Sequence, residues 1–255
     1  MNAEKAVKIR LNTFETNSSS MHTVIIIKKS DYTDINLALN EYIKSIPEDA
    51  RTYSSDGGIY LPVPRDEYGD PYNFGRGFGI FTSWKEKFAY VLASLQGDAD
   101  KINSLVNMLR NKSNINIAGI CIILSNYGSD KLFESERHPS MLVPVHRYIL
   151  WGEYGDIDHQ SLDNLSNCLE AMSKSPEYAN MSVEEKLYEI IFSNKIAIVE
   201  DSDETDTLTE YIAANILDCS KIEKVLMHSY VNGYDKPAVA TFESIESYIS
   251  RSYDD

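Results

Sequence analysis

The chain has 255 residues, of which 43% are hydrophobic, so it can bury a core and is not a wholly disordered protein. Its 24 basic and 39 acidic residues give a formal net charge of −15. A field of that sign repels phosphate backbones, so direct binding to nucleic acid is not expected. The uninterrupted apolar runs are too short to span a bilayer, and we expect no membrane association.

The cysteines and the first residues indicate a compartment. Cys121, Cys168 and Cys219 are odd in number and widely spaced, which is typical of isolated thiols in a reducing compartment rather than of a disulfide framework or a zinc site. Residues 1–5 lack the apolar core of a secretory signal. We therefore expect a cytoplasmic protein.

Hydrophobic spacing and turn residues predict the elements in chain order. In the first part of the chain these are strands over 6–13 and 24–27, a helix over 33–46, a short strand over 59–63, helices over 83–95 and 99–110, and strands over 115–124 and 141–151. They are followed by helices over 161–172 and 182–192, a strand over 195–199, a helix over 207–217, a hairpin of 224–231 and 238–242, and a helix over 243–250.

Some of these segments carry further information. The β-branched run 24–27 is typical of a strand buried on both faces, and 115–124 is the strongest strand, which we expect to be central. Residues 48–82 are rich in Gly and Pro and predict a long irregular segment. Loops of this length in a compact domain are usually functional or mobile, so we expect a functional loop or a mobile insertion here. Strands and helices neither alternate strictly nor segregate, so we predict one α+β domain over 1–255, with a mixed sheet and helices packed around it.

The stretch 14–22, Phe-Glu-Thr-Asn-Ser-Ser-Ser-Met-His, lies between the first two predicted strands. Its consecutive Ser18, Ser19 and Ser20, close to His22, offer hydroxyl and backbone N–H groups to an anion or a substrate. Serine-rich turns also bond to their own backbone, so a purely structural turn remains open.

The same stretch resembles the N-terminal signature FETNSSSxH of a family of phage and prophage proteins. The glycine-rich segment 74–77 followed by Lys87-x-x-Tyr90, the run Ile-Asp-His-Gln-Ser at 157–161, and the acidic cluster 200–203 are similar to later motifs of that family. The family's acidic cluster usually includes an Asn, which this chain lacks there. Because the family has no established activity, the resemblance implies where a site lies and says little of its chemistry.

A second histidine, His159, follows Asp158 and precedes Ser161. A carboxylate bonded to an imidazole holds its tautomer and tunes it as a general base. The structural alternative is that Asp158 or Ser161 caps the helix predicted to begin there. With the resemblance, a site shared with the serine stretch is the better hypothesis, and we expect the serines, His22 and His159 to surround one pocket.

Other types of site find less support. The chain has no Gly-x-Ser-x-Gly elbow, so a standard serine hydrolase is not indicated. A metal held by His22, His159, Asp156 and Asp158 lacks the fixed spacing of strong metal motifs, so metal-free chemistry is favoured.

The glycine-rich run 75–79 would allow a backbone to approach a phosphate, although it is neither a P-loop nor a dinucleotide fingerprint. Arg76, Lys85 and Lys87 form a local basic group that a phosphate-bearing ligand needs. For the two lysines the alternative is the solvated face of a helix. The acids Asp201, Asp203, Glu204 and Asp206 are interpreted as a solvated loop after an edge strand, or as ligands of a divalent cation.

The leading hypothesis is a phage-type enzyme of the host cytoplasm that acts on a nucleotide or another phosphate-bearing small molecule. His159 is expected to act as general acid or base positioned by Asp158, with His22 and Ser19 as further catalytic residues. The expected substrate-binding residues are Asn17, Ser18, Ser20, Arg76, Lys87 and Tyr90. The alternative is a non-catalytic acidic protein whose surface mimics nucleic acid and binds a basic groove on a host or anti-phage defence protein.

Overall fold

The computed structural model describes residues 20–28, 31–66, 72–74, 79–95, 99–123, 142–144, 156–157, 164–202, 218–229 and 239–252, which we call the described residues. The predicted strand over 6–13, the predicted helix over 207–217 and the predicted turn between the hairpin strands lie outside them.

A five-stranded antiparallel sheet forms the base of the molecule. In spatial order it consists of β10 (Val239–Ser244), β9 (Ile222–Ser229), β1 (Ser20–Ile27), β8 (Ile196–Ser202) and β4 (Ile80–Phe81). All neighbours in this sheet pair antiparallel. The predicted antiparallel pairing of the last two strands is confirmed by β9 and β10.

Two smaller sheets are formed by the other strands of the described residues. β5 (Ile117–Ile123) lies between β2 (Ile59–Pro62), which is parallel to it, and β6 (Leu142–Pro144), which is antiparallel. β3 (Asn73–Phe74) and β7 (Asp156–Ile157) form a parallel pair. The predicted α+β class with mixed sheets is confirmed. The expectation that 115–124 is central holds only for the three-stranded sheet, because β5 is not part of the larger one.

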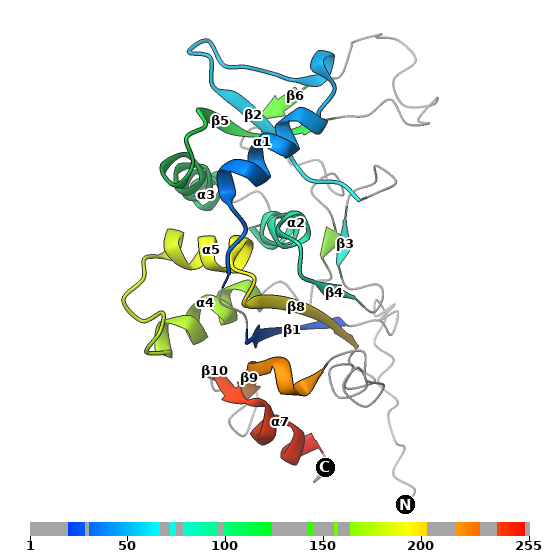
Figure 1. Ribbon diagram of the computed structural model, residues 1–255, viewed down its shortest axis with the longest axis vertical. Coiled ribbons are helices and arrows are strands. Elements are labelled where there is room, and N and C mark those ends of the chain that lie inside the picture. The colour runs from blue at the N-terminus through cyan, green and yellow to red at the C-terminus, as the bar shows by residue number, and fades with distance from the viewer. Residues whose placement is uncertain are drawn as a thin grey trace, which may run out of the picture.

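The helices pack between and around the sheets. They are α1 (Ile35–Ser45), α2 (Trp84–Leu95), α3 (Ala99–Lys112), α4 (Asn164–Lys174), α5 (Val183–Phe192) and α7 (Ile245–Ser252), with short 3₁₀ turns at Glu48–Ala50 and Cys219–Lys221. Figure 1 shows α2, α4 and α5 between the two larger sheets, and α7 on the far face of the five-stranded sheet. In the described part of the chain, no helix has the length and apolar character needed to cross a bilayer.

Strand β1 is buried on both faces at Ile25 and Ile26, as the apolar run 24–27 predicts. Successive strand residues point to opposite faces. Ile26 joins the large core cluster with α2, α3, α4 and α5, whereas its neighbour Ile25 joins the small cluster with Ile245 and Tyr248 of α7. Both isoleucines are fully buried.

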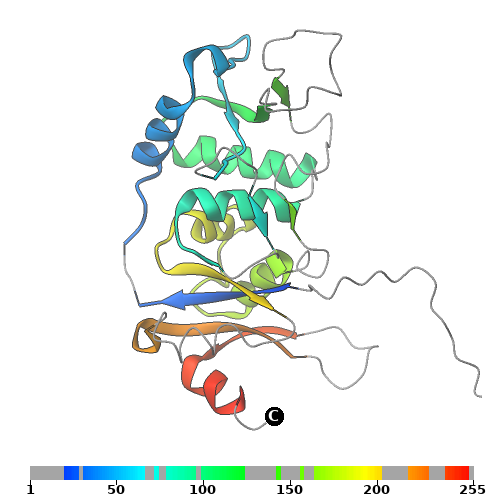
Figure 2. The same ribbon diagram turned by 90° about the vertical axis from the view of Figure 1, so that its right-hand side faces the viewer.

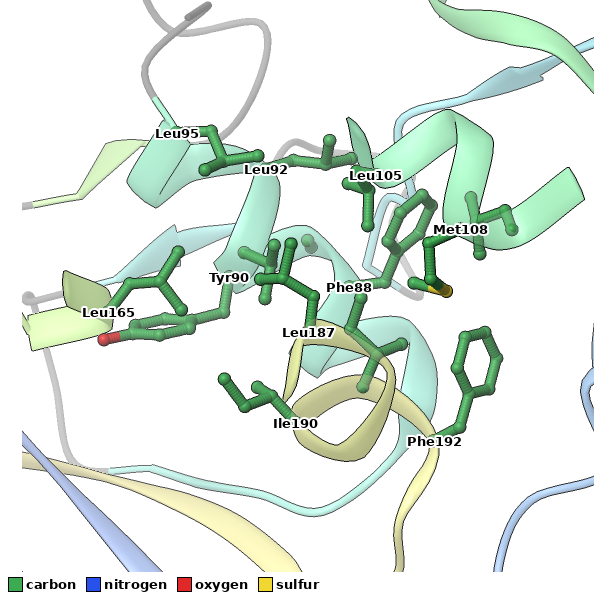
Figure 3. Packing of buried hydrophobic residues seen from close by; sticks show 14 of the residues in the cluster. Phe88, Tyr90, Leu92, Leu95, Leu105, Met108, Leu165, Leu187, Ile190 and Phe192 are labelled. Atoms are coloured by element: carbon green, nitrogen blue, oxygen red, sulfur yellow. The ribbon is translucent and has the colours of Figure 1, made fainter. Parts of the chain in front are cut away.

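Helix α2 is the centre of the large core. Its residues from Lys87 to Ala93 are all buried, which is the pattern of a helix surrounded by other elements rather than one lying at a surface. Figure 3 shows Phe88 and Leu92 of α2 facing Leu105 and Met108 of α3 on one side, with Leu187 and Ile190 of α5 nearby.

Two helices begin with reciprocal caps. The Ser182 hydroxyl accepts from the Glu185 N–H, and the Glu185 carboxylate accepts from the Ser182 N–H, so these two residues form a capping box at the start of α5. Ser83 and Glu86 repeat this arrangement at the start of α2. Both caps satisfy N–H groups that the helix itself leaves without partners.

Replacing Ser182 with alanine is expected to lower the free energy of unfolding by about 0.5–2 kcal/mol, because the Glu185 N–H loses its acceptor. Chemical denaturation of the purified protein measures this change. Ser166→Ala, at an exposed position of α4, is the matched control and should leave stability unchanged or slightly raised, since alanine favours a helix interior. Equal losses in the two variants would contradict the role assigned to the cap.

Candidate functional site

Three adjacent strands of the large sheet, β1, β8 and β4, begin or end on the same side of the sheet, and this row of strand ends is the edge discussed below. β1 begins at Ser20 where β8 ends at Ser202, and these two residues are paired. His22 of β1 is paired with Glu200 of β8. β4 begins on the other side of β8, with Ile80 opposite Val199. Figure 2 shows β1 and β8 running in opposite directions, so that the start of one lies beside the end of the other.

The described part of the acidic run, Glu200 and Asp201, lies in a strand and not in the predicted loop, whereas Asp203, Glu204 and Asp206 lie outside the described residues. We expected a loop after an edge strand that ends at Val199, but β8 continues through Glu200 and Asp201 to Ser202 and lies between β1 and β4. The physical reason is that the ladder joins backbone groups, so polar residues extend a strand wherever a partner strand is present. Ser20 and His22 likewise belong to β1 and not to a loop.

The short β3–β7 pair leads into two more of the predicted motifs. Phe74 is paired with Ile157. The chain continues from Phe74 into the glycine-rich segment, and from Ile157 into Asp158 and His159.

Aromatic contacts join this pair to the large sheet. The Phe74 ring meets the Phe81 ring of β4 edge-on, with centroids 5.2 Å apart, and the Tyr90 ring of α2 at 5.3 Å. Phe81 in turn is paired with Ile198 of β8. The chain thus enters two of the predicted motifs beside the middle of β8, where Ile198 is paired with Phe81 on one side and with Val24 of β1 on the other.

Most of the predicted site residues lie outside the described residues. These are Asn17, Ser18, Ser19, Arg76, Asp158 and His159. The expectation that His22 and His159 surround one pocket stays a prediction. Ser20 and His22 are placed by the register of β1, as given above.

Lys87 has a different role from the predicted one. Its side chain is fully buried, and its ammonium donates to the carbonyl oxygens of Ser193 at 2.7 Å and of Ile196 at 2.9 Å. These carbonyls lie at the start of β8, the end opposite Glu200. The ammonium joins α2 to this strand inside the fold, which speaks against both a contact with substrate and a place on a solvated helix face.

Tyr90, one turn after Lys87, is also a core residue, with 1% of its surface exposed. Besides the contact with Phe74, Figure 3 shows its ring extending toward Leu165 of α4. The Lys-x-x-Tyr motif thus lies on the buried side of α2, where one residue contacts β8 and the other contacts β3.

The three cysteines are free, and two of them have unreactive thiols. Cys121 and Cys168 are buried, and burial raises the pKa of each thiol to about 12, so neither supplies a thiolate at neutral pH. Cys219 is exposed, and all three are free, as the sequence predicts. Within the described ranges, no three His, Cys, Asp or Glu side chains are grouped so as to hold a metal ion.

The pairing of His22 with Glu200 is the main feature that sequence reasoning missed. The two residues are far apart in the chain, and their pairing depends on where β1 and β8 begin, which the spacing of apolar residues does not determine. Comparison of the chain with known proteins gave no match to a protein family, a curated protein or a solved structure.

Proposed function

We propose that the chain is an enzyme that acts on a nucleotide or another phosphate-bearing small molecule, at the edge of the large sheet where β1 begins and β8 ends. The observation that carries the proposal is the pairing of His22 with Glu200. Opposed residues of an antiparallel pair share a face of the sheet, with Cβ atoms about 4.5–5.5 Å apart. A separation of that size is one that a hydrogen bond between a carboxylate and an imidazole can span.

Such a pair suits acid–base chemistry. The carboxylate of Glu200 would hold the imidazole of His22 in one tautomer and raise its basicity, which is the tuning that a general base at neutral pH requires. The neighbouring pair Ser20 and Ser202 would supply hydroxyls to the ligand. Arg76 and His159, carried by the segments that follow β3 and β7, would bind phosphate and provide the second acid or base.

The experiment is a search for turnover followed by paired substitutions. The purified protein is incubated with nucleoside phosphates and sugar phosphates, and products are followed by ³¹P NMR. His22→Gln and Glu200→Gln are each expected to lower the rate by a factor of about 10²–10⁴, the usual contribution of general acid–base catalysis. The melting temperature should change little.

The control variant comes from another strand of the same sheet. Glu223→Gln lies on β9, at the end where that strand pairs with the last residues of β1, so it makes the same chemical change as Glu200→Gln away from this edge and should leave the rate unchanged. An absence of turnover with every phosphate class, or equal rates in all three variants, would show that the proposed reaction class is wrong.

The net charge of −15 favours a second candidate, a non-catalytic protein that binds a basic partner. Its interaction with that partner would weaken steeply as salt is raised beyond physiological strength, where the Debye length is about 8 Å. His22→Gln would not affect it, because the attraction comes from many carboxylates.

A further inference from the structure

A cavity of about 270 Å³ opens at the other end of strands β1 and β8. Tyr32, which follows β1, is bridged to Ser193, which precedes β8, and β8 has seven residues, or about 20 Å at the usual rise per strand residue. The cavity is therefore distinct from the edge discussed above. Its walls come from α3, α5 and the segments before α1 and α5: Tyr32, Lys112, Met181, Glu185, Tyr188 and Glu189.

Glu189 supplies a nearly buried carboxylate to this cavity. Only 7% of its surface is exposed, and the Tyr32 hydroxyl donates to both of its oxygens, at 3.1 and 3.0 Å. One hydroxyl uses a small part of the roughly four acceptor positions of a carboxylate. The nearby Lys195 ammonium binds Glu177 at 3.0 Å. Burial raises the pKa of Glu189 from its ordinary value, with Lys195 and the Tyr32 hydrogen bond opposing the shift.

The aromatic wall already binds one cation of the chain itself. The Lys112 ammonium lies 5.3 Å from the centroid of the Tyr188 ring, and the Tyr32 ring stacks near Tyr188 with centroids 6.3 Å apart. Ammonium groups within about 6 Å of an aromatic centroid are attracted by the negative face of the ring. The ring of Tyr188 is thus placed to receive an ammonium.

The described residues of the lining carry more carboxylates than cations. Burial and then the charge of Glu189 raise the pKa values of both Tyr32 and Tyr188. Glu185 adds a second carboxylate to the lining, although one of its oxygens caps α5. Against these two carboxylates, Lys112 is the single cation among the described residues of the lining.

We propose that this cavity binds a protonated alkyl amine, with the ammonium at the Glu189 carboxylate and the alkyl chain against the rings of Tyr32 and Tyr188. The volume equals that of on the order of nine water molecules, which suits a side-chain-sized ligand rather than a large one. The amine is either a free small molecule or a lysine side chain of a basic partner. The proposal does not depend on the proposed enzymatic function.

Calorimetric titration with n-butylammonium and 1,5-diaminopentane tests the free-amine source. Binding to the full chain is expected to weaken at least tenfold in Glu189→Gln, which keeps the shape and the acceptor for Tyr32 but removes the charge. Glu184→Gln, on the same helix outside the cavity lining, is the matched control and should bind as the natural chain does.

A substitution of Lys112 is expected to have the opposite effect on the affinity for the amine. If the added amine takes the place that the Lys112 ammonium holds over Tyr188, Lys112→Gln should bind the amine several-fold more tightly. Lys85→Gln makes the same charge change at another cation–aromatic contact, over Tyr42, and should have no such effect. Equal gains in the two lysine variants would mean general charge attraction and would overturn the site.

A lysine-containing peptide and its acetyl-lysine form show whether the bound amine is a free small molecule or a lysine side chain of a partner. Tight binding of the peptide, lost on acetylation and in Glu189→Gln, with weak binding of the free amines, identifies a partner's lysine. Tighter binding of a free amine identifies a small-molecule ligand. If neither amine nor peptide binds in a way that depends on Glu189, the proposal is wrong. The turnover experiment at His22 is unaffected by either outcome.

Discussion

Replacing Lys87 with methionine is expected to lower the free energy of unfolding by about 2–4 kcal/mol, because two buried carbonyl oxygens lose a charged donor. Methionine fills a similar volume, so the loss reports the hydrogen bonds rather than a cavity. The carbonyls of Ser193 and Ile196 flank the turn into β8, so this strand should lose order first. Chemical denaturation gives the free energy, and amide hydrogen exchange identifies the strand.

Lys85→Met is the matched control for this prediction. Lys85 lies on the same helix, half-buried, with its ammonium 5.3 Å from the centroid of the Tyr42 ring. Such a contact contributes about 0.5–1 kcal/mol at an exposed site. A loss in Lys87→Met no larger than that in Lys85→Met would mean that the buried ammonium is not needed to join α2 to β8.

Lys87 also shows where sequence reasoning reaches its limit. The apolar spacing of 83–95 predicts α2 within a residue at its start, because one apolar stripe is enough to specify a helix. That spacing does not tell whether the remaining faces are covered. Those faces of α2 are covered by α3, α4, α5 and the start of β8, which lie elsewhere in the chain. The spacing alone therefore predicts that Lys87 contacts a substrate or the solvent.

Both proposed sites likewise depend on contacts between distant segments, which the apolar spacing does not predict. The run 24–27 predicts a strand buried on both faces, and Ile25 and Ile26 confirm it. Yet the pairing of His22 with Glu200 depends on the register of two distant strands. Glu189 does carry a signal in the sequence: it stands next to Ile190 and Ile191 in a short amphipathic helix, and a carboxylate on an apolar face needs a partner. The partner, Tyr32, is 157 residues away.

The largest loss of stability is expected from Phe74→Ala, at about 3–5 kcal/mol, the usual cost of removing a buried phenylalanine ring. Phe74 has 1% of its surface exposed and contacts the rings of Tyr72, Phe81 and Tyr90. The three rings come from the segment before β3, from β4 and from α2, so the ring holds the β3–β7 pair against the large sheet. Chemical denaturation measures the loss.

Phe74→Leu and Phe81→Ala are the comparison variants for this prediction. Leucine keeps most of the apolar volume, so Phe74→Leu should lose clearly less stability than Phe74→Ala. Phe81 is already partly exposed, so its removal should also cost less than that of Phe74. If the β3–β7 pair positions the segments that carry Arg76 and His159, Phe74→Leu should lower any phosphate turnover more than its small loss of stability explains. If the turnover rate of Phe74→Leu falls only in proportion to the fraction of folded protein, the β3–β7 pair is not part of the site. The site would then consist only of the edge where β1 meets β8.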